Sequence, residues 1–95
     1  MNGAMPARKI LVAGHVQGVF FREWTVSRAR EIGVTGWVRN RRDGRVEAYA
    51  AGDTAQLDRF TEKLREGSPA SRVDDIEIED APLEQFEAFV RRQSE

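Results

Sequence analysis

The sequence predicts an α+β domain in which two helices cover one face of a single, mostly antiparallel sheet. Strand-like apolar runs alternate with two segments of helical spacing, and glycines or turn sequences separate them. A chain of 95 residues is long enough for one domain with one core. We expect a disordered extension over residues 1–6, a single domain over 7–92 and a tail over 93–95.

The first strand and the first helix are predicted on either side of a loop. Residues 8–13, RKILVA, form an apolar run with β-branched members, which is typical of a central strand that ends at Gly14. Residues 22–32 contain good helix formers, and Gly33 is suited to the left-handed cap at the helix end. The apolar face of this helix is predicted to consist of Phe21, Thr25, Ala29 and Ile32.

A β-hairpin is predicted next. Residues 34–40, VTGWVRN, and 45–52, RVEAYAAG, are strand-like, and the Asp43-Gly44 pair between them is a strong hairpin signal. The second run shows the alternation of a strand. Its two sets of residues are Val46, Ala48 and Ala50, and Arg45, Glu47 and Tyr49.

The second helix begins with a capping-box pattern, because Asp53 precedes Gln56 by three residues. Gly67 and Pro69 are expected to end it. Three apolar residues fall on one face of this helix at helical spacing, namely Leu57, Phe60 and Leu64.

The last third of the chain predicts two further strands. Residues 72–80, RVDDIEIED, suit a strand with one wet face, because Ile76 and Ile78 alternate with acids. A short fifth strand is predicted at 86–91, FEAFVR. The complete order, β-α-β-β-α-β with a short fifth strand, is the ferredoxin-like split βαβ pattern.

Composition excludes several kinds of site. The chain has no cysteine, which excludes disulfides, thiolate metal sites and cysteine nucleophiles, and His15 is the only histidine. Asp74 and Asp75 are neighbours on a predicted strand and therefore point to opposite faces, so we expect no metal site there. We also expect no cofactor. There is no apolar run of about 20 residues and no secretory signal, so a cytoplasmic location without membrane contact is expected.

Charge is distributed unevenly along the chain. The formal net charge is −1, which gives no general attraction to nucleic acid. Residues 1–52 contain nine Lys and Arg against four Asp and Glu, whereas residues 53–95 contain six against twelve. The first half is therefore better suited to bind an anion.

The loop at residues 14–22, GHVQGVFFR, combines several features of an anion site. A loop that enters a helix N-terminus presents unpaired N–H groups and the positive end of the helix dipole. Glycine permits a close approach of a ligand to the backbone, and the Arg22 guanidinium offers a planar fork for two phosphate oxygens. The alternatives are that the loop only turns the chain, that Arg22 is solvated or paired with an acid such as Glu23, and that His15 is a surface residue.

Asn40 ends the predicted strand GWVRN, residues 36–40. An asparagine at this place often serves the following turn. The alternative is a neutral carboxamide that positions a water molecule, since it has a donor and an acceptor in one plane and does not repel an anion. Trp37 is interpreted as a packing residue.

These two segments resemble the acylphosphatase family. Its pattern G-x-V-Q-G-V-x-F-R matches residues 14–22, its pattern G-W-V-R-N matches 36–40, and D-G-x-V-E matches 43–47. The likeness spans about residues 7–92. It implies a metal-independent hydrolase that cleaves acyl phosphates to a carboxylate and inorganic phosphate. The implied site has Arg22 on the phosphoryl group and Asn40 on the attacking water, with the phosphoryl oxygens held by the backbone amides of His15, Val16, Gln17, Gly18 and Val19.

Two other functions are compatible with the resemblance or with the fold. Domains of this kind also occur without independent activity inside larger carbamoyl-transferring maturation enzymes. We expect a free enzyme, because no zinc-finger cysteines follow the domain. A ferredoxin-like module for RNA or a small effector would need exposed aromatic residues on the middle strands, where only Tyr49 is present. A monomer is expected, because a single core uses all the isolated apolar positions of the chain and leaves none for an interface.

Overall fold

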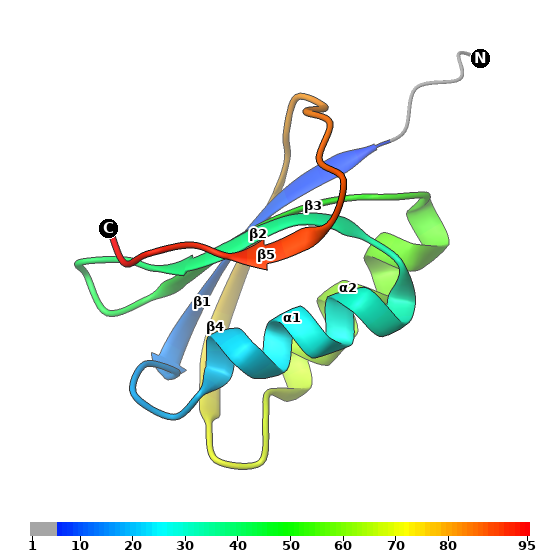
Figure 1. The fold of residues 1–95 in the computed structure, drawn as a ribbon. Helices are drawn as coiled ribbons and strands as arrows, with labels where there is room; N and C mark the ends of the chain where they lie inside the picture. The colour runs from blue at the N-terminus through cyan, green and yellow to red at the C-terminus, as the bar shows by residue number, and fades with distance from the viewer. Residues whose placement is uncertain (1–5) are drawn as a thin grey trace.

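A computed structural model gives the structure of residues 6–95, so the disordered extension predicted over 1–6 lies outside the described residues except for Pro6. Figure 1 shows both helices on the same face of one sheet. The strand order is β4-β1-β3-β2-β5. The predicted ferredoxin-like α+β fold is therefore confirmed. Its elements are β1 (Ala7–His15), α1 (Phe21–Ile32), β2 (Thr35–Asn40), β3 (Val46–Ala51), α2 (Thr54–Glu66), β4 (Arg72–Asp80) and β5 (Phe89–Arg91).

The topology of the sheet determines where the β1–α1 loop lies. Strand β3 pairs antiparallel with both β1 and β2, so β1 and β2 run parallel to each other on either side of it. Helix α1 makes the crossover between these two strands. The β1–α1 loop and the end of β2 consequently lie at the same end of the sheet. In the register of the sheet, Asn40 is opposite Val46, which in turn is opposite Val12.

The main core lies between the sheet and the helices. The four residues predicted on α1 and the three predicted on α2 are all buried. Phe21, Phe60 and Phe89 are among the largest fully buried side chains. The rings of Phe60 and Phe89 meet edge to face at 5.5 Å between centroids. Burial of one such side chain contributes roughly 1.5–3 kcal/mol, so this layer fixes α1 and its N-terminal loop on the sheet.

A smaller apolar cluster covers the other face of the sheet. Trp37 and Tyr49 stack at 6.2 Å between ring centroids, and Phe86 lies edge-on to Tyr49 at 5.6 Å. The Tyr49 hydroxyl donates to the Pro82 carbonyl at 2.7 Å. The packing role predicted for Trp37 is confirmed. The fifth strand is shorter than the predicted 86–91, because Phe86 packs against this cluster instead of continuing the sheet edge.

The first strand is longer than predicted. It extends beyond residue 13 to His15, with a register shift between Ala13 and Gly14 where it pairs with β4. Gly14 has φ 136°, and a Cβ at this position would overlap the carbonyl oxygen of Arg72. Glycine therefore allows β1 and β4 to pair closely just before the loop. The predicted left-handed cap at Gly33 and the capping box at Asp53 are both present.

Candidate active site

A pocket of about 260 Å³ opens where the β1–α1 loop meets the end of β2. It brings together Arg22 and Asn40, which belong to different motifs of the sequence. Of the five predicted backbone positions, Val16 and Gly18 line it. The complete lining is Val16, Gly18, Phe20, Phe21, Arg22, Glu23, Asn40 and Arg91.

The loop between β1 and α1 is fixed by its apolar side chains. Val16 is 1% exposed, and Val19 packs against the main core. Gly18 has φ 75°, a left-handed conformation that favours glycine. Outside the helices and the strand ladders, the backbone hydrogen bonds of residues 6–95 include none donated by residues 16–19. The loop therefore presents unpaired amides next to the N-terminus of α1, as anion-binding loops do.

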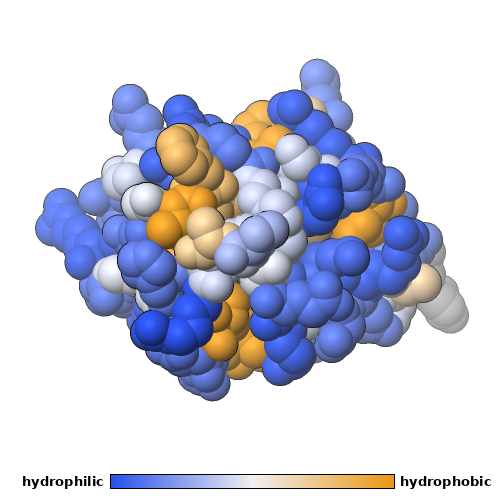
Figure 2. All heavy atoms as spheres, turned by 90° about the horizontal axis from the view of Figure 1, so that it is seen from below, coloured by the Kyte–Doolittle hydropathy of each residue, from blue (hydrophilic) through white to orange (hydrophobic). Residues whose placement is uncertain are grey.

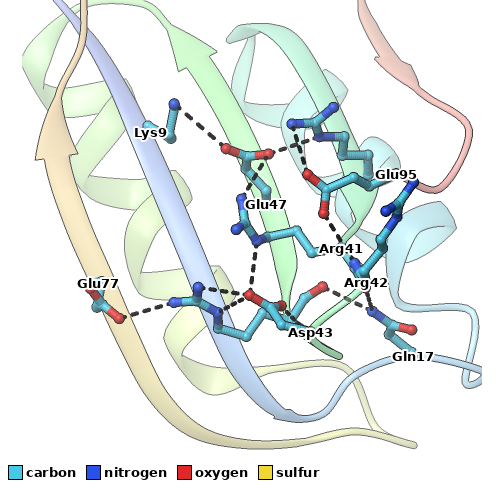
Figure 3. Close-up of polar contacts among 10 residues, drawn as sticks. Lys9, Gln17, Arg41, Arg42, Asp43, Glu47, Glu77 and Glu95 are labelled. Atoms are coloured by element: carbon cyan, nitrogen blue, oxygen red, sulfur yellow. Dashed lines mark hydrogen bonds and ion pairs between the residues drawn. The ribbon is translucent and has the colours of Figure 1, made fainter.

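The remaining predicted loop residues do not line the pocket. His15 is the exposed last residue of β1 and lies opposite Arg72 on β4. Gln17 donates its side-chain amide to the carbonyl oxygens of Arg41 and Arg45, both at 2.9 Å. Figure 3 shows this side chain beside the β2–β3 hairpin. Gln17 thus ties the loop to the connection that follows Asn40, a role for its side chain that the sequence did not indicate.

Arg22 is held by the segment that follows β5. One of its terminal nitrogens, Nη1, donates to the carbonyl oxygen of Arg92 at 3.1 Å. The guanidinium of Arg92 lies over the Trp37 ring, 4.5 Å from its centroid. In the part of the chain that the structure describes, no carboxylate forms an ion pair with Arg22, and the nearby Glu23 pairs with Arg91 instead. Arg22 lines the pocket, is half-buried and forms no ion pair among residues 6–95.

Asn40 is the last residue of β2, and its backbone carbonyl accepts from the amide of Glu95 at 2.9 Å. Its side-chain oxygen, Oδ1, is buried and has no hydrogen-bond partner among the described residues. The hairpin turn is closed by other groups. The amide of Arg41 donates to the Arg45 carbonyl at 2.8 Å, and Asp43 accepts from the Arg45 amide at 3.0 Å. The geometry favours a side chain that acts in the pocket over one that serves the turn.

An ion pair between α1 and β5 lies at the rim of the pocket. The guanidinium of Arg91 donates to the carboxylate of Glu23. A backbone hydrogen bond, followed by the hydrogen bond and charge of Arg91, holds the pKa of Glu23 below its ordinary value. The pair is 68 positions apart in the sequence, so no local pattern signals it. It neutralises an acid that would otherwise face an anion in the pocket.

The acidic side chains are dispersed over the described part of the chain. Among residues 6–95, no three His, Cys, Asp or Glu side chains are grouped so that they could hold a metal ion. Asp74 pairs with Arg72 at 2.8 Å, and this hydrogen bond lowers the pKa of Asp74.

Residues 6–95 include no helix that is long and apolar enough to cross a membrane.

Fold and pocket together define a ferredoxin-like domain in which the β1–α1 loop, a guanidinium and a carboxamide line one pocket. The acylphosphatase family model matches residues 8–91. This chain therefore belongs to the acylphosphatase family. Membership implies an enzyme that hydrolyses acyl phosphates to a carboxylate and inorganic phosphate.

Individual relatives agree with this assignment. An acylphosphatase of Rhizorhabdus wittichii is 52% identical over 86 residues, which cover 90% of this chain and 87% of that protein. The crystal structure of an acylphosphatase from Bacillus subtilis is 40% identical and superposes with a TM-score of 0.89 over 93% of this chain and 99% of that one. Full-length HypF also matches, at 25% identity and a TM-score of 0.89, but this chain covers 12% of it.

Proposed function

We propose that this chain is a metal-independent acylphosphatase in which Arg22 and the loop amides bind the phosphoryl group and Asn40 orients the attacking water. The main support is that Asn40 and Arg22, which come from separate motifs, line one pocket, and that the buried Oδ1 of Asn40 has no hydrogen-bond partner among residues 6–95. A buried polar atom without a partner is unfavourable for folding and is a common sign of a functional site.

The phosphoryl group binds at the N-terminus of α1. We assign the cradle to the amides of residues 15–19, of which those of 16–19 make no backbone hydrogen bond in the loops and turns of the described residues. Arg22 adds a charged, planar fork, and its contact with the Arg92 carbonyl limits the directions in which that fork can point. Donors fixed in this way stabilise charge in the transition state without reorganising during the reaction.

The water molecule is held by Asn40 on the β2 side of the pocket. Its carboxamide forms a hydrogen bond with the water, which directs a lone pair of the water toward phosphorus. Asn40 is neutral, so it does not repel the phosphoryl oxygens as a carboxylate would. The backbone of Asn40 is fixed by β3 and by the amide of Glu95, which limits movement of the side chain.

The chemistry requires few groups because the leaving group is a carboxylate. The water oxygen forms a bond to phosphorus while the bond between phosphorus and the acyl oxygen breaks. The electron pair of the broken bond remains on the carboxylate, which departs without needing a proton. The proton of the water passes to a phosphoryl oxygen. Phosphoryl transfer of this kind depends mainly on placement and charge stabilisation, which Arg22 and the amides supply.

Release of inorganic phosphate from benzoyl phosphate, measured with and without a strong chelator, tests the proposal. We expect turnover above the uncatalysed rate that is equal under both conditions. Loss of turnover on chelation would contradict metal independence, and absence of turnover under both conditions would contradict the proposed function.

A further inference from the structure

Phe20 is unusual among the apolar residues of this chain because its side chain is 80% exposed. The other large hydrophobic residues that are exposed in the described part of the chain, Ile78, Leu83 and Val90, lie between 41% and 43%. Its neighbour Phe21 is 1% exposed and belongs to the core. Phe20 therefore adds almost nothing to the packing of the folded domain.

The backbone of Phe20 is also unfavourable for an aromatic residue. Phe20 has φ 60° and ψ 27°, and it is the one non-glycine residue with positive φ among those described. It occupies the N-cap position of α1 but makes no side-chain capping hydrogen bond there. Glycine or asparagine would adopt this conformation at lower cost. Neither local conformation nor capping explains an aromatic side chain at this position.

The side chain of Phe20 lies where it can contact a molecule bound in the pocket. Phe20 lines the same pocket as Arg22 and Asn40. Buried Val16 and Phe21 lie deeper in this lining, whereas the exposed ring of Phe20 lies at the mouth. Figure 2 shows the end of the molecule that contains the loop, where apolar side chains gather in a patch among hydrophilic ones. A substrate with its phosphoryl group on the loop amides would direct its other end toward this mouth.

We infer that Phe20 is a specificity-determining residue that packs against the acyl group, so that the enzyme favours acyl phosphates with apolar, above all aromatic, acyl groups. This inference rests on the proposed function, because the phosphoryl group must occupy the loop for the acyl group to reach Phe20. The strained conformation at Phe20 holds the ring over the pocket instead of in the core. An aromatic acyl group then gains a ring contact that an acetyl group is too small to make.

The ratio of kcat/KM for benzoyl phosphate to kcat/KM for acetyl phosphate tests this inference. Phe20→Asn removes the ring and keeps a residue that tolerates the left-handed conformation. We expect the ratio to fall by about fivefold, the size of one aromatic contact. Thermal unfolding should show an unchanged or higher midpoint, because the substitution relieves strain in the backbone.

Leu83→Ala is the matched control, since it removes an exposed apolar side chain outside the pocket lining. Its ratio should equal that of the wild type. An unchanged ratio in Phe20→Asn, with both substrates hydrolysed, would overturn the inference and leave the proposed function intact. Hydrolysis of neither substrate by the wild type would overturn the proposed function, and this inference with it.

Discussion

At the scale of single residues, the side chain of Asn40 has the clearest consequence for activity. Its Oδ1 is buried without a hydrogen-bond partner among residues 6–95, so Asn40→Ala breaks no hydrogen bond of this atom that the structure shows. Loss of one preorganised hydrogen-bonding group typically lowers the rate by about 10²–10³. We expect a fall of this size in kcat for benzoyl phosphate with little change in KM. Thermal unfolding of the same variant should remain close to that of the wild type. Near-normal turnover would show that Asn40 does not orient the water.

Arg22 is predicted to tolerate no replacement by lysine. Lysine keeps the positive charge but lacks the rigid planar fork of arginine. That fork can contact two phosphoryl oxygens while another of its N–H groups donates to the Arg92 carbonyl. We expect Arg22→Lys to weaken inhibition by inorganic phosphate and to lower kcat/KM by about tenfold or more. Arg28→Lys is a suitable control, because Arg28 lies on the same helix outside the pocket lining. Equal activity of Arg22→Lys and wild type would contradict the bidentate role.

At the scale of elements, the ion pair between Glu23 on α1 and Arg91 on β5 sets the charge at the pocket rim. Arg91→Ala leaves the carboxylate of Glu23 facing the anionic substrate. We expect KM to rise roughly two- to fivefold near pH 7, which is modest because both side chains are about half exposed. The double variant Glu23→Gln/Arg91→Ala should restore KM most of the way toward the wild type, and failure to do so would contradict a charge effect.

The pH dependence of this effect follows from the pKa of Glu23, which is lowered in the folded protein. In the wild type the ion pair stabilises the fold above the ordinary pKa of glutamate and ceases to do so as pH falls through the lowered value. Without Arg91 the pKa of Glu23 rises part of the way toward its ordinary value, because the backbone hydrogen bond that lowers it most remains. The excess KM of Arg91→Ala over the double variant should therefore shrink as the assay pH is lowered from 7 toward 4. An excess that is constant over this range would exclude titration of Glu23 as its cause.

At the scale of the whole molecule, local patterns predicted most of the fold. Capping residues and helical spacing define α1 and α2, and their boundaries agree with the structure because these signals lie within a few residues of one another. The two ends of the sheet were less predictable. The extension of β1 to His15 depends on close pairing with β4, and the late start of β5 depends on packing of Phe86 against Tyr49. Both contacts join residues that are far apart in the sequence.

The candidate site was predictable in part for the same reason. The motifs indicated Arg22 and Asn40, and the parallel arrangement of β1 and β2 explains why both line one pocket. The side-chain role of Gln17 and the rim contact of Arg91 with Glu23 were not predicted, since each depends on a distant partner. The backbone of Phe20 was not predicted either, because an aromatic residue at positive φ contradicts local propensity. These exceptions to local sequence patterns all lie in or beside the candidate site.

The buried carboxylate of Glu47 gives a last prediction, about stability. Glu47 is 2% exposed near the start of β3, the central strand of the sheet, where its carboxylate accepts from Arg39 at 2.8 Å and lies 3.6 Å from Lys9 (Figure 3). Glu47→Gln keeps the shape of the side chain but removes the negative charge that balances these cations. We expect the free energy of unfolding to fall by about 1–3 kcal/mol. The unfolding midpoint should then fall by about 4–8 °C for each kcal/mol.

The control variant is Glu62→Gln, which breaks an exposed ion pair with Arg65 on α2. It should lower the free energy of unfolding by less than about 0.5 kcal/mol. An equal loss in the two variants would contradict a structural role for the buried charge of Glu47.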